Sequence, residues 1–263
     1  MKPLSFLFHF GYNQALACLF PVAIFLTLAL SKIFPLSILP RYDFILILCL
    51  LMQVFMVTAK FETWDELKVI CLFHVIGLAL ELYKVHMGSW SYPEEGFSKL
   101  WGVPLYSGFM YASVASYMCQ SWRRLHLTLV NWPPTIIAAI TAAAIYLNFF
   151  THHFIIDLRW ILMGVVFLVF CRTIVMFTVN NQPYHMPVVL SFVLMGFFIW
   201  IAENVATFFG AWQYPNQEDG WHLVHFSKIS SWLLLVIVSF LIVALLKHVK
   251  QTESRKQANN LSK

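Results

Sequence analysis

The stretch ELYKVHMGSWSYP, which runs from Glu81 to Pro93, returns later in the chain as ENVATFFGAWQYP, from Glu203 to Pro215. Glu, Gly, Trp, Tyr and Pro recur at identical spacing, and the two copies are offset by 122 residues. Each copy starts near the end of a long apolar segment and leads into the next one. We interpret this repeated phrase as the mark of an internal duplication, which sets the architecture expected for the whole chain.

The composition indicates an integral membrane protein. Of the 263 residues, 60% are hydrophobic and 11% are charged, whereas soluble domains carry roughly 25% charged residues. A helix needs about 20 mostly apolar residues to cross the hydrocarbon core of a bilayer. Eight apolar runs approach this length, and they comprise residues 15–34, 43–59, 67–87, 104–121, 132–150, 159–179, 187–209 and 229–247.

The predicted fold class is therefore all-α, because backbone groups inside a bilayer must be paired within each segment. We expect a polytopic membrane protein with about eight transmembrane helices in two parallel four-helix repeats. Repeat A would cover about residues 10–121 and repeat B about residues 132–247, both within a single transmembrane domain over 1–248. Residues 249–263 would form a basic cytoplasmic tail.

The distribution of basic residues predicts an orientation. Lys60, Lys68, Arg123 and Arg124 share one side with the basic tail if both termini are cytoplasmic, as the positive-inside rule favours. The expected location is the inner (cytoplasmic) membrane. The basic tail favours membrane anchoring over nucleic-acid binding, so the expected partner is a membrane lipid or an apolar small molecule. The oligomeric state is left open.

The repeated phrase combines features of a helix end at a membrane surface. Gly88 and Gly210 suit the left-handed residue that closes a last helical turn, and the prolines that follow prevent continuation. The aromatic residues suit the headgroup level, where a ring meets both lipid and water. They are also the candidate substrate-binding residues, namely Trp90, Tyr92, Trp212 and Tyr214.

The two glutamates of the phrase are the principal candidate catalytic residues. Glu203 lies seven residues before its glycine, about 10 Å inside the helix end by helical rise, and Glu81 has the same register. A carboxyl group in lipid is costly unless it is paired, protonated or faces water. We expect the two to lie at equal depth and to share a cavity. The alternative is a neutral, hydrogen-bonded Glu that locks two helices together.

Other polar residues in apolar segments extend the candidate site. His74 stands two helical turns before Glu81 on the same face and, with Asp157, is a further candidate catalytic residue. Arg172 interrupts an apolar run and needs an anion, a carbonyl group or water. Arg172 and Asn204, which adjoins Glu203, are candidate substrate-binding residues.

No metal or cofactor is expected from the motifs. The five cysteines fall within apolar runs, where they behave as small apolar residues. The adjacent histidines at 152 and 153 lack a spaced set of further ligands. Nucleotide-binding glycine loops and metalloprotease signatures are absent from the sequence.

The segment FHVIGLALELYKVHMGSWSYPEEGFSKLWGVPLYSGFMYASVASYM and the second copy AWQYP resemble a bacterial integral-membrane family, domain of unknown function 817. A more distant resemblance is to the carotenoid hydratases and heterodimer-type lycopene cyclases, through Glu81, Gly88, Tyr92 and the Gly-Val-Pro-Leu run at 102–105. The cyclases' Pro-x-Glu-Glu motif is distorted here in PEEGF at 93–97, and the hydratases' Gly-x-Tyr-x-Tyr run is absent. The second resemblance implies acid chemistry on a polyene, without a metal or nucleotide.

Three functions are consistent with these features. The first is a lipid- or isoprenoid-modifying enzyme, in which a carboxyl kept neutral by an apolar site protonates a double bond. The second is a small-molecule or proton-coupled transporter or membrane binding protein, because parallel halves with intramembrane carboxyls also describe carriers. The third is a structural or sensory membrane protein without turnover.

Overall fold

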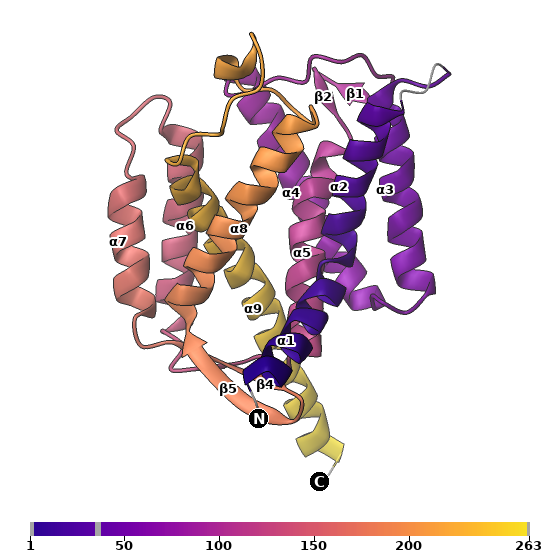
Figure 1. Ribbon diagram of the computed structural model, residues 1–263. Coiled ribbons are helices and arrows are strands. Elements are labelled where there is room, and N and C mark those ends of the chain that lie inside the picture. Colours follow the sequence, from indigo (N-terminus) through magenta and orange to yellow (C-terminus); the bar gives the residue numbers. More distant parts are fainter. Residues whose placement is uncertain (1–2, 35–37, 262–263) are drawn as a thin grey trace. The chain divides into compact units, whose positions relative to one another are not determined.

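The computed structural model describes residues 3–34 and 38–261, and within these ranges it describes side chains from Leu4 to Ala244. Within these residues the chain forms nine α-helices, one short 3-10 helix and five short strands (Figure 1). It divides into two compact units. Unit 1 comprises Met1–His126, Val179–Gln182 and Ile201–His225, and unit 2 comprises Leu127–Thr178, Pro183–Trp200 and Phe226–Lys263.

Unit 1 is built from helices and from the loops that join them. Its elements are α1 (Pro3–Ala17), α2 (Leu19–Ile33), α3 (Arg41–Thr58), α4 (Trp64–His86), β1 (Lys99–Leu100), β2 (Val103–Pro104), α5 (Ser107–Arg124), the last part of α8 (Val188–Phe208) and the 3-10 helix η1 (Pro215–Gln217). α1 and α2 meet at a bend of 64°. A capping box of Thr63 and Glu66 fixes the start of α4, because each side chain satisfies a backbone N–H that the first turn leaves free.

Helices α4 and α5 lie side by side in close contact (Figure 1). A Cβ atom at Gly77 of α4 would lie 2.4 Å from Cγ of Tyr111, and one at Gly108 of α5 would lie 2.8 Å from the ring of His74. Only glycine permits this approach, since real Cβ atoms do not come so close to ring atoms. The packing places Tyr111 against the last turns of α4.

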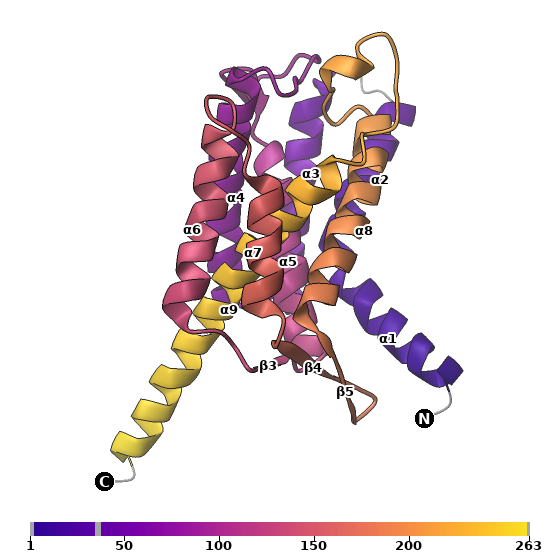
Figure 2. The same ribbon diagram turned by 90° about the vertical axis from the view of Figure 1, so that its left-hand side faces the viewer.

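Unit 2 is organised around an aromatic core. Its elements are β3 (Thr128–Val130), α6 (Thr135–Thr151), α7 (Arg159–Phe170), most of β4 (Ile174–Val179) and β5 (Gln182–Pro187), the first part of α8, and α9 (Lys228–Leu261). The strands form a three-stranded sheet in the order β3-β4-β5. Phe170, Phe192, Trp132 and Phe240 form edge-to-face or tilted ring pairs with centroids 5.3–6.4 Å apart. α6 and α7 lie side by side in both views (Figures 1 and 2).

Three of the described helices, α3, α4 and α8, are long and apolar enough to cross a membrane. The bent pair α1 and α2 would make a fourth candidate span if it crosses as one unit. α6, α7 and the part of α9 from Lys228 to Ala244 are apolar but shorter. The structure is thus mostly helical with three or four candidate spans, and the division into eight spans stays a prediction.

The helix expected over residues 159–179 is wrong from residue 171 onward. α7 ends at Phe170, and Ile174–Val179 forms strand β4, whose side chains alternate between buried and partly buried. A continuous apolar run hides this two-residue period, which is why it resembles a helix in the sequence. Arg172 lies in the turn between the two elements and is exposed, so it is not in the interior of a helix as expected.

Two further segments differ from the expected organisation. α1 spans Pro3–Ala17, whereas the first expected run begins only at residue 15, so no element was expected over most of this helix. The tail expected at 249–263 continues α9 as far as Leu261, while its side chains and residues 262–263 lie outside the described part of the chain. The single transmembrane domain over 1–248 and the two repeats stay predictions.

Candidate functional site

The two copies of the repeated phrase end their helices in the same way. Gly88 and Gly210 have φ angles of 67° and 69°, in the left-handed region that glycine adopts without a Cβ penalty. Ser89 N–H donates to the carbonyl five residues earlier at 2.9 Å, and Ala211 N–H does the same at 2.9 Å. This pattern is a Schellman ending, so the glycines act as the phrase predicts.

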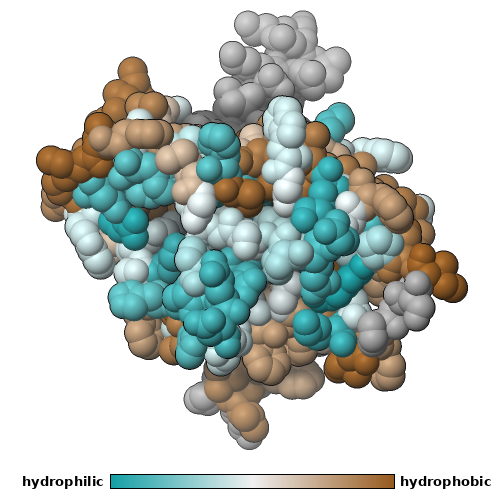
Figure 3. All heavy atoms as spheres, turned by 90° about the horizontal axis from the view of Figure 1, so that it is seen from above, coloured by the Kyte–Doolittle hydropathy of each residue, from teal (hydrophilic) through white to brown (hydrophobic). Residues whose placement is uncertain are grey.

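The loops that follow these glycines pair with each other. Ser91 N–H donates to the carbonyl of Gln213, and Gln213 N–H donates to the carbonyl of Ser91, each at 2.9 Å. Ser91 and Gln213 occupy the same position in the two copies. Figure 1 draws these loops at the upper ends of α4 and α8, and Figure 3, which views that end, shows hydrophilic side chains gathered there.

Glu81 lies inside a shell of aromatic hydrogen-bond donors. Glu81 is buried, with only 3% of the residue exposed. Oε2 accepts hydrogen bonds from Trp90 Nε1 and from the Tyr92 hydroxyl, both at 2.7 Å, and Oε1 accepts one from the Tyr111 hydroxyl at 2.9 Å. Trp90 and Tyr92 come from the repeated phrase itself, whereas Tyr111 comes from α5.

Glu203 repeats part of this arrangement. It is 2% exposed, and its Oε1 accepts a hydrogen bond from the hydroxyl of Tyr214. Tyr214 follows Glu203 by the same eleven residues that separate Tyr92 from Glu81. The two copies therefore bring the same tyrosine to the same glutamate.

One ring contact connects the two carboxyl groups. The indole of Trp90, which donates to Glu81, stands edge-on to the ring of Tyr214, with centroids 6.0 Å apart. Tyr214 in turn donates to Glu203. We call Glu81, Glu203 and the aromatic residues that join them, Trp90, Tyr92, Tyr111 and Tyr214, the carboxyl–aromatic cluster.

The loop tyrosines of this cluster are held neutral. Burial, and then the charge of the glutamate that each one contacts, raises the pKa of Tyr92 and of Tyr214 well above the usual value. Both causes disfavour a phenolate in the site. These hydroxyl groups therefore keep their protons at neutral pH and can donate to Glu81 and Glu203.

Arg41 binds both the loop that follows α4 and the C-terminal end of α8. Its Nη1 lies 2.6 Å from Glu94 Oε1 and 3.1 Å from the carbonyl oxygen of Gly210, and its Nη2 donates to the carbonyl of Phe209. Its Nε donates to Ser31 at 3.0 Å. One planar guanidinium thus caps the end of α8 and pairs with the loop after the first phrase, a geometry that five fixed donors permit.

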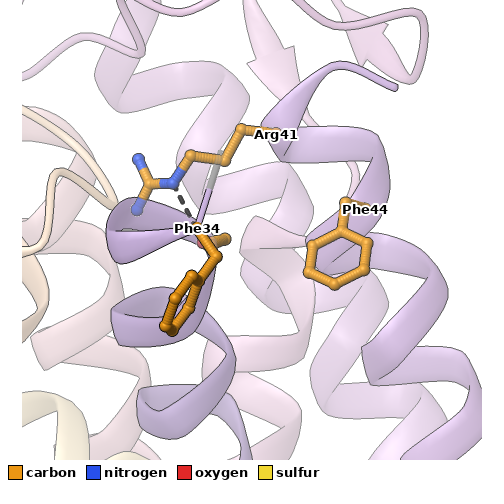
Figure 4. Close-up of a pocket in the computed structure, with 4 residues that line it drawn as sticks. Phe34, Arg41 and Phe44 are labelled. Atoms are coloured by element: carbon orange, nitrogen blue, oxygen red, sulfur yellow. Dashed lines mark hydrogen bonds between the residues drawn. The ribbon is translucent and has the colours of Figure 1, made fainter. Parts of the chain in front are cut away.

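A small pocket lies beside Arg41. It is lined by Ser31, Phe34, Arg41 and Phe44 and has room for about one water molecule. Figure 4 shows the Arg41 side chain extending from α3 toward the end of α2 near Phe34. The guanidinium already donates to five oxygen atoms. We therefore interpret this pocket as packing space beside Arg41 and not as a ligand site.

The other predicted site residues lie in different places. His74 is on α4, with its ring 4.5 Å from that of Phe109, and its buried Nδ1 has no hydrogen-bond partner among the described residues. Asn204 Oδ1 accepts from the backbone N–H of Val224 at 2.9 Å and so anchors the loop after η1. Trp212 is buried and its side chain hydrogen-bonds with Tyr214.

Asp157 and Arg172 belong to unit 2, whereas the carboxyl–aromatic cluster belongs to unit 1. Asp157 pairs with Arg159, whose Nη2 lies 2.7 Å from Oδ2, and also accepts from Asn148 at 3.3 Å. Arg172 is exposed in its turn. The structure therefore joins Glu81, Glu203, Trp90, Tyr92 and Tyr214 into one cluster within unit 1.

Sequence reasoning missed three residues of this site. Tyr111 lies in α5 and was counted only as part of an apolar run, and no local spacing connects it to Glu81. Arg41 was not singled out, and Glu94 was considered only within the PEEGF run at 93–97. The one signal for Tyr111 was Gly77, four residues before Glu81, which marks where another helix approaches closely.

The carboxyl–aromatic cluster combines two carboxyl groups with hydroxyl and indole hydrogen-bond donors, a set of groups suited to proton transfer. Among the described residues, no three His, Cys, Asp or Glu side chains lie close enough to hold a metal ion. Fold and site together define a helical protein with three or four helices able to cross a membrane and a buried carboxyl–aromatic cluster.

The chain belongs to the family described as protein of unknown function DUF817, whose model matches residues 6–240. It is 66% identical over 256 residues to the uncharacterised protein YoaT of Bacillus subtilis (strain 168), covering 97% of each chain. A crystal structure of a cross-linked trimer of an MvINS variant is similar with 13% identity and a TM-score of 0.46, covering 68% of this chain and 92% of that one.

Proposed function

We propose that this protein is a membrane enzyme that moves protons on an isoprenoid or a similar apolar lipid. One observation supports the proposal above the others: two buried carboxyl groups are joined through aromatic rings in one cluster. Glu81 and Glu203 serve as acid and base, and the rings of Trp90 and Tyr214 lie between them. His74 and Asp157 remain proposed further catalytic residues, and Arg172, Asn204 and Trp212 proposed substrate-binding residues.

The chemistry balances without a co-reactant. One protonated glutamic acid gives its proton to a carbon of a double bond, whose π electrons form the new C–H bond and leave a cation on the adjacent carbon. The π faces of Trp90 and Tyr214 stabilise that cation. The second glutamate, ionised, removes a proton from a neighbouring carbon and the C–H electrons form a new double bond. The net reaction is an isomerisation or a cyclisation.

The resemblance to carotenoid hydratases and lycopene cyclases is consistent with this chemistry. It rests on Glu81, Gly88, Tyr92 and the Gly-Val-Pro-Leu run at 102–105. Glu81 and Tyr92 are directly hydrogen-bonded here, and Gly88 closes the helix between them. If water attacks the cation in place of proton loss, and the resulting oxonium ion gives a proton to the ionised glutamate, the same acid step gives a hydration.

The proposed setting is the inner membrane, crossed by eight spans in two parallel four-helix repeats, with both termini cytoplasmic. The equal endings of α4 and α8 and the pairing of Ser91 with Gln213 support such a duplication. Reporter fusions after Arg124 and at the C-terminus should then be cytoplasmic, and one after Glu95 should be external. An external C-terminus would contradict the eight-span topology.

A deuterium experiment tests the enzymatic proposal directly. The purified protein in lipid vesicles, containing an isoprenoid extracted from the host membrane, is incubated in D₂O, and the lipid is analysed by mass spectrometry. Acid–base turnover places deuterium on carbon. The variants Glu81→Gln and Glu203→Gln should abolish incorporation, because a side-chain amide neither gives up nor takes up a proton at neutral pH.

The matched control is Glu218→Gln, which changes an exposed carboxyl of the second loop and should leave incorporation unchanged. Absence of carbon-bound deuterium with the folded wild-type protein across the extracted isoprenoids would contradict the enzymatic proposal.

A second candidate function is a proton-coupled carrier or membrane binding protein. The pairing of equivalent residues Ser91 and Gln213 favours it, because parallel halves related by an axis along the membrane normal are a feature of carriers. A carrier would give substrate-dependent acidification inside sealed vesicles without changing the lipid. That result, together with no deuterium on carbon, would select this second function.

A further inference from the structure

Unit 1 contains another buried carboxyl group, Glu62, which lies in the loop between α3 and α4. The residue is 3% exposed. Its Oε2 accepts a hydrogen bond from Gln53 Nε2 of α3 at 2.6 Å, and its Oε1 accepts one from the hydroxyl of Ser116 of α5. Ser116 is fully buried. Neutral donors from two helices therefore hold both oxygens of Glu62 at the opposite end of α4 from Glu81.

No cation neutralises this carboxyl. Among the described residues, no Lys, Arg or His nitrogen lies within 4.0 Å of the Glu62 oxygens. Arg123 of α5 is near but is engaged elsewhere: its Nη2 donates to the carbonyl of Phe61, and its Nε lies 3.6 Å from Glu66 Oε1. A buried carboxylate without a cation is costly, so its charge must be removed in another way.

The atoms around Glu62 supply a place for a proton. Gln53 Oε1 is buried and has no hydrogen-bond partner among the described residues. The oxygen and nitrogen of an amide have nearly the same shape. Rotation of the Gln53 amide by half a turn would place its oxygen 2.6 Å from Glu62 Oε2, where it accepts from a carboxylic acid O–H.

We propose that Glu62 is a proton-binding site of this protein, in which a proton bound by the carboxyl group takes the place of a cation. The site is distinct from the carboxyl–aromatic cluster, and the inference does not depend on the lipid chemistry proposed there. Gln53 and Ser116 position the carboxyl. Proton release would leave Glu62 ionised under the influence of the negative charge of Glu66 and the positive charge of Arg123.

The charges that act on Glu62 agree with this assignment. Burial raises the pKa of Glu62; the hydrogen bonds from Ser116 and Gln53 lower it, the negative charge of Glu66 of α4 raises it, and the positive charge of Arg123 of α5 lowers it. The net direction is upward, as burial of a carboxyl without a close cation predicts. α3 contributes the neutral Gln53.

Infrared spectroscopy of the full chain in lipid vesicles tests the proposal. A protonated carboxylic acid has a carbonyl stretch that is separate from the bands of carboxylates and amides. At neutral pH the wild-type protein should show such a band, the Glu62→Gln variant should lose a component of it, and alkaline titration should remove that component above the usual pKa of Glu.

Two variants separate this site from its neighbours. Glu66→Gln changes a buried glutamate that is paired with Arg123. Because the charge of Glu66 raises the pKa of Glu62, this variant should show the Glu62 component but lose it at a lower pH than the wild type does. The double variant Glu81→Gln/Glu203→Gln removes the other buried carboxyls that the function requires, and the Glu62 component should persist in it. Loss of the whole band in this double variant would assign the proton to the carboxyl–aromatic cluster and overturn the proposal.

If Glu62→Gln does not fold, ¹³C NMR of the unmodified side chains in the Glu81→Gln/Glu203→Gln background replaces it. A glutamate carboxyl carbon that titrates above the usual pKa of Glu supports the proposal. Titration of every glutamate in the usual range overturns it, as does a wild-type infrared band that Glu62→Gln leaves unchanged.

Discussion

Ser91 and Gln213 exchange two backbone hydrogen bonds of 2.9 Å, although they are 122 residues apart. An antiparallel bridge has a local two-fold axis that relates its two residues, and these two residues occupy equivalent positions of a repeated phrase. The bridge holds together the two loops whose tyrosines donate to Glu81 and Glu203. Its integrity should therefore decide whether the carboxyl–aromatic cluster is assembled.

A disulfide should form across this bridge. The residues of a hydrogen-bonded antiparallel pair have Cα atoms about 5.5 Å apart, which is within the range of disulfides. In a background with the exposed Cys71 and Cys171 replaced by Ser, Ser91→Cys/Gln213→Cys should oxidise within one chain, as detected by peptide mass spectrometry. Ser89→Cys/Gln213→Cys is the out-of-register control. Equal oxidation of both pairs would show that the loops are not held in this register.

The glycines that end α4 and α8 should not accept a side chain. Gly88→Ala and Gly210→Ala each place a Cβ at a left-handed φ, which costs about 1–2 kcal/mol. Gly210→Ala should be at least as destabilising, because its Cβ would also lie 3.4 Å from Arg41 Nη1. Chemical unfolding in detergent measures the change. Gly164→Ala in α7, where a Cβ meets nothing within 4 Å, should be neutral or stabilising; a loss there equal to the others would contradict the conformational argument.

Removal of the tyrosine hydroxyls should weaken the cluster. Tyr92→Phe removes one of the two donors to Glu81 Oε2, which still accepts from Trp90, and a hydrogen bond of this kind contributes about 0.5–1.5 kcal/mol. Tyr214→Phe should have a similar effect through Glu203. Unfolding free energies and deuterium incorporation into lipid should both fall. Tyr12→Phe, at a residue that is 57% exposed, is the control and should change stability by less than about 0.5 kcal/mol.

Lysine should not replace Arg41. The guanidinium reaches Ser31, Glu94 and the carbonyls that end α8 at the same time, and a single ammonium group lacks this fork. Arg41→Lys should therefore lose about 1–3 kcal/mol of unfolding free energy, because at least one buried partner is left unpaired. Lys68→Ala removes an ion pair with Asp65 in which both side chains are more than half exposed, and it should change little. Full stability of Arg41→Lys would show that the charge alone suffices.

Asp157 should stabilise unit 2 in a pH-dependent manner. Burial raises the pKa of Asp157, but the hydrogen bonds from the Arg159 backbone and Asn148 and the charge of Arg159 outweigh it, so the net pKa is lowered. A lowered pKa contributes stability above the unfolded-state value of about 3.9, and the contribution is lost as pH falls through the folded-state pKa. The stability difference between wild type and Asp157→Asn should shrink over that acid range. A difference independent of pH would assign the effect to packing.

Much of the helical framework could be predicted from the chain, because apolar runs and helix-ending residues are local signals. Helices lie within or near each predicted run, and Gly88 and Gly210 end α4 and α8 as the phrase indicates. The strand β4 could not be separated from a helix, since an apolar stretch with β-branched residues carries both periods. By length and composition, three of the described helices could cross a membrane, or four if the bent pair α1 and α2 is one span.

The candidate site was predicted in part, because only some of its contacts follow from spacing along the chain. The sequence determined that Glu81 and Glu203 stand at equal depth in their helices and are followed by a tyrosine eleven residues later, because spacing along a chain fixes position along a helix. Only the tertiary structure decided that Tyr111 completes the shell of Glu81, that Arg41 caps α8, and that Gln53 and Ser116 enclose Glu62. These partners come from other helices, and the contacts between helices depend on how whole faces pack, which no local spacing records.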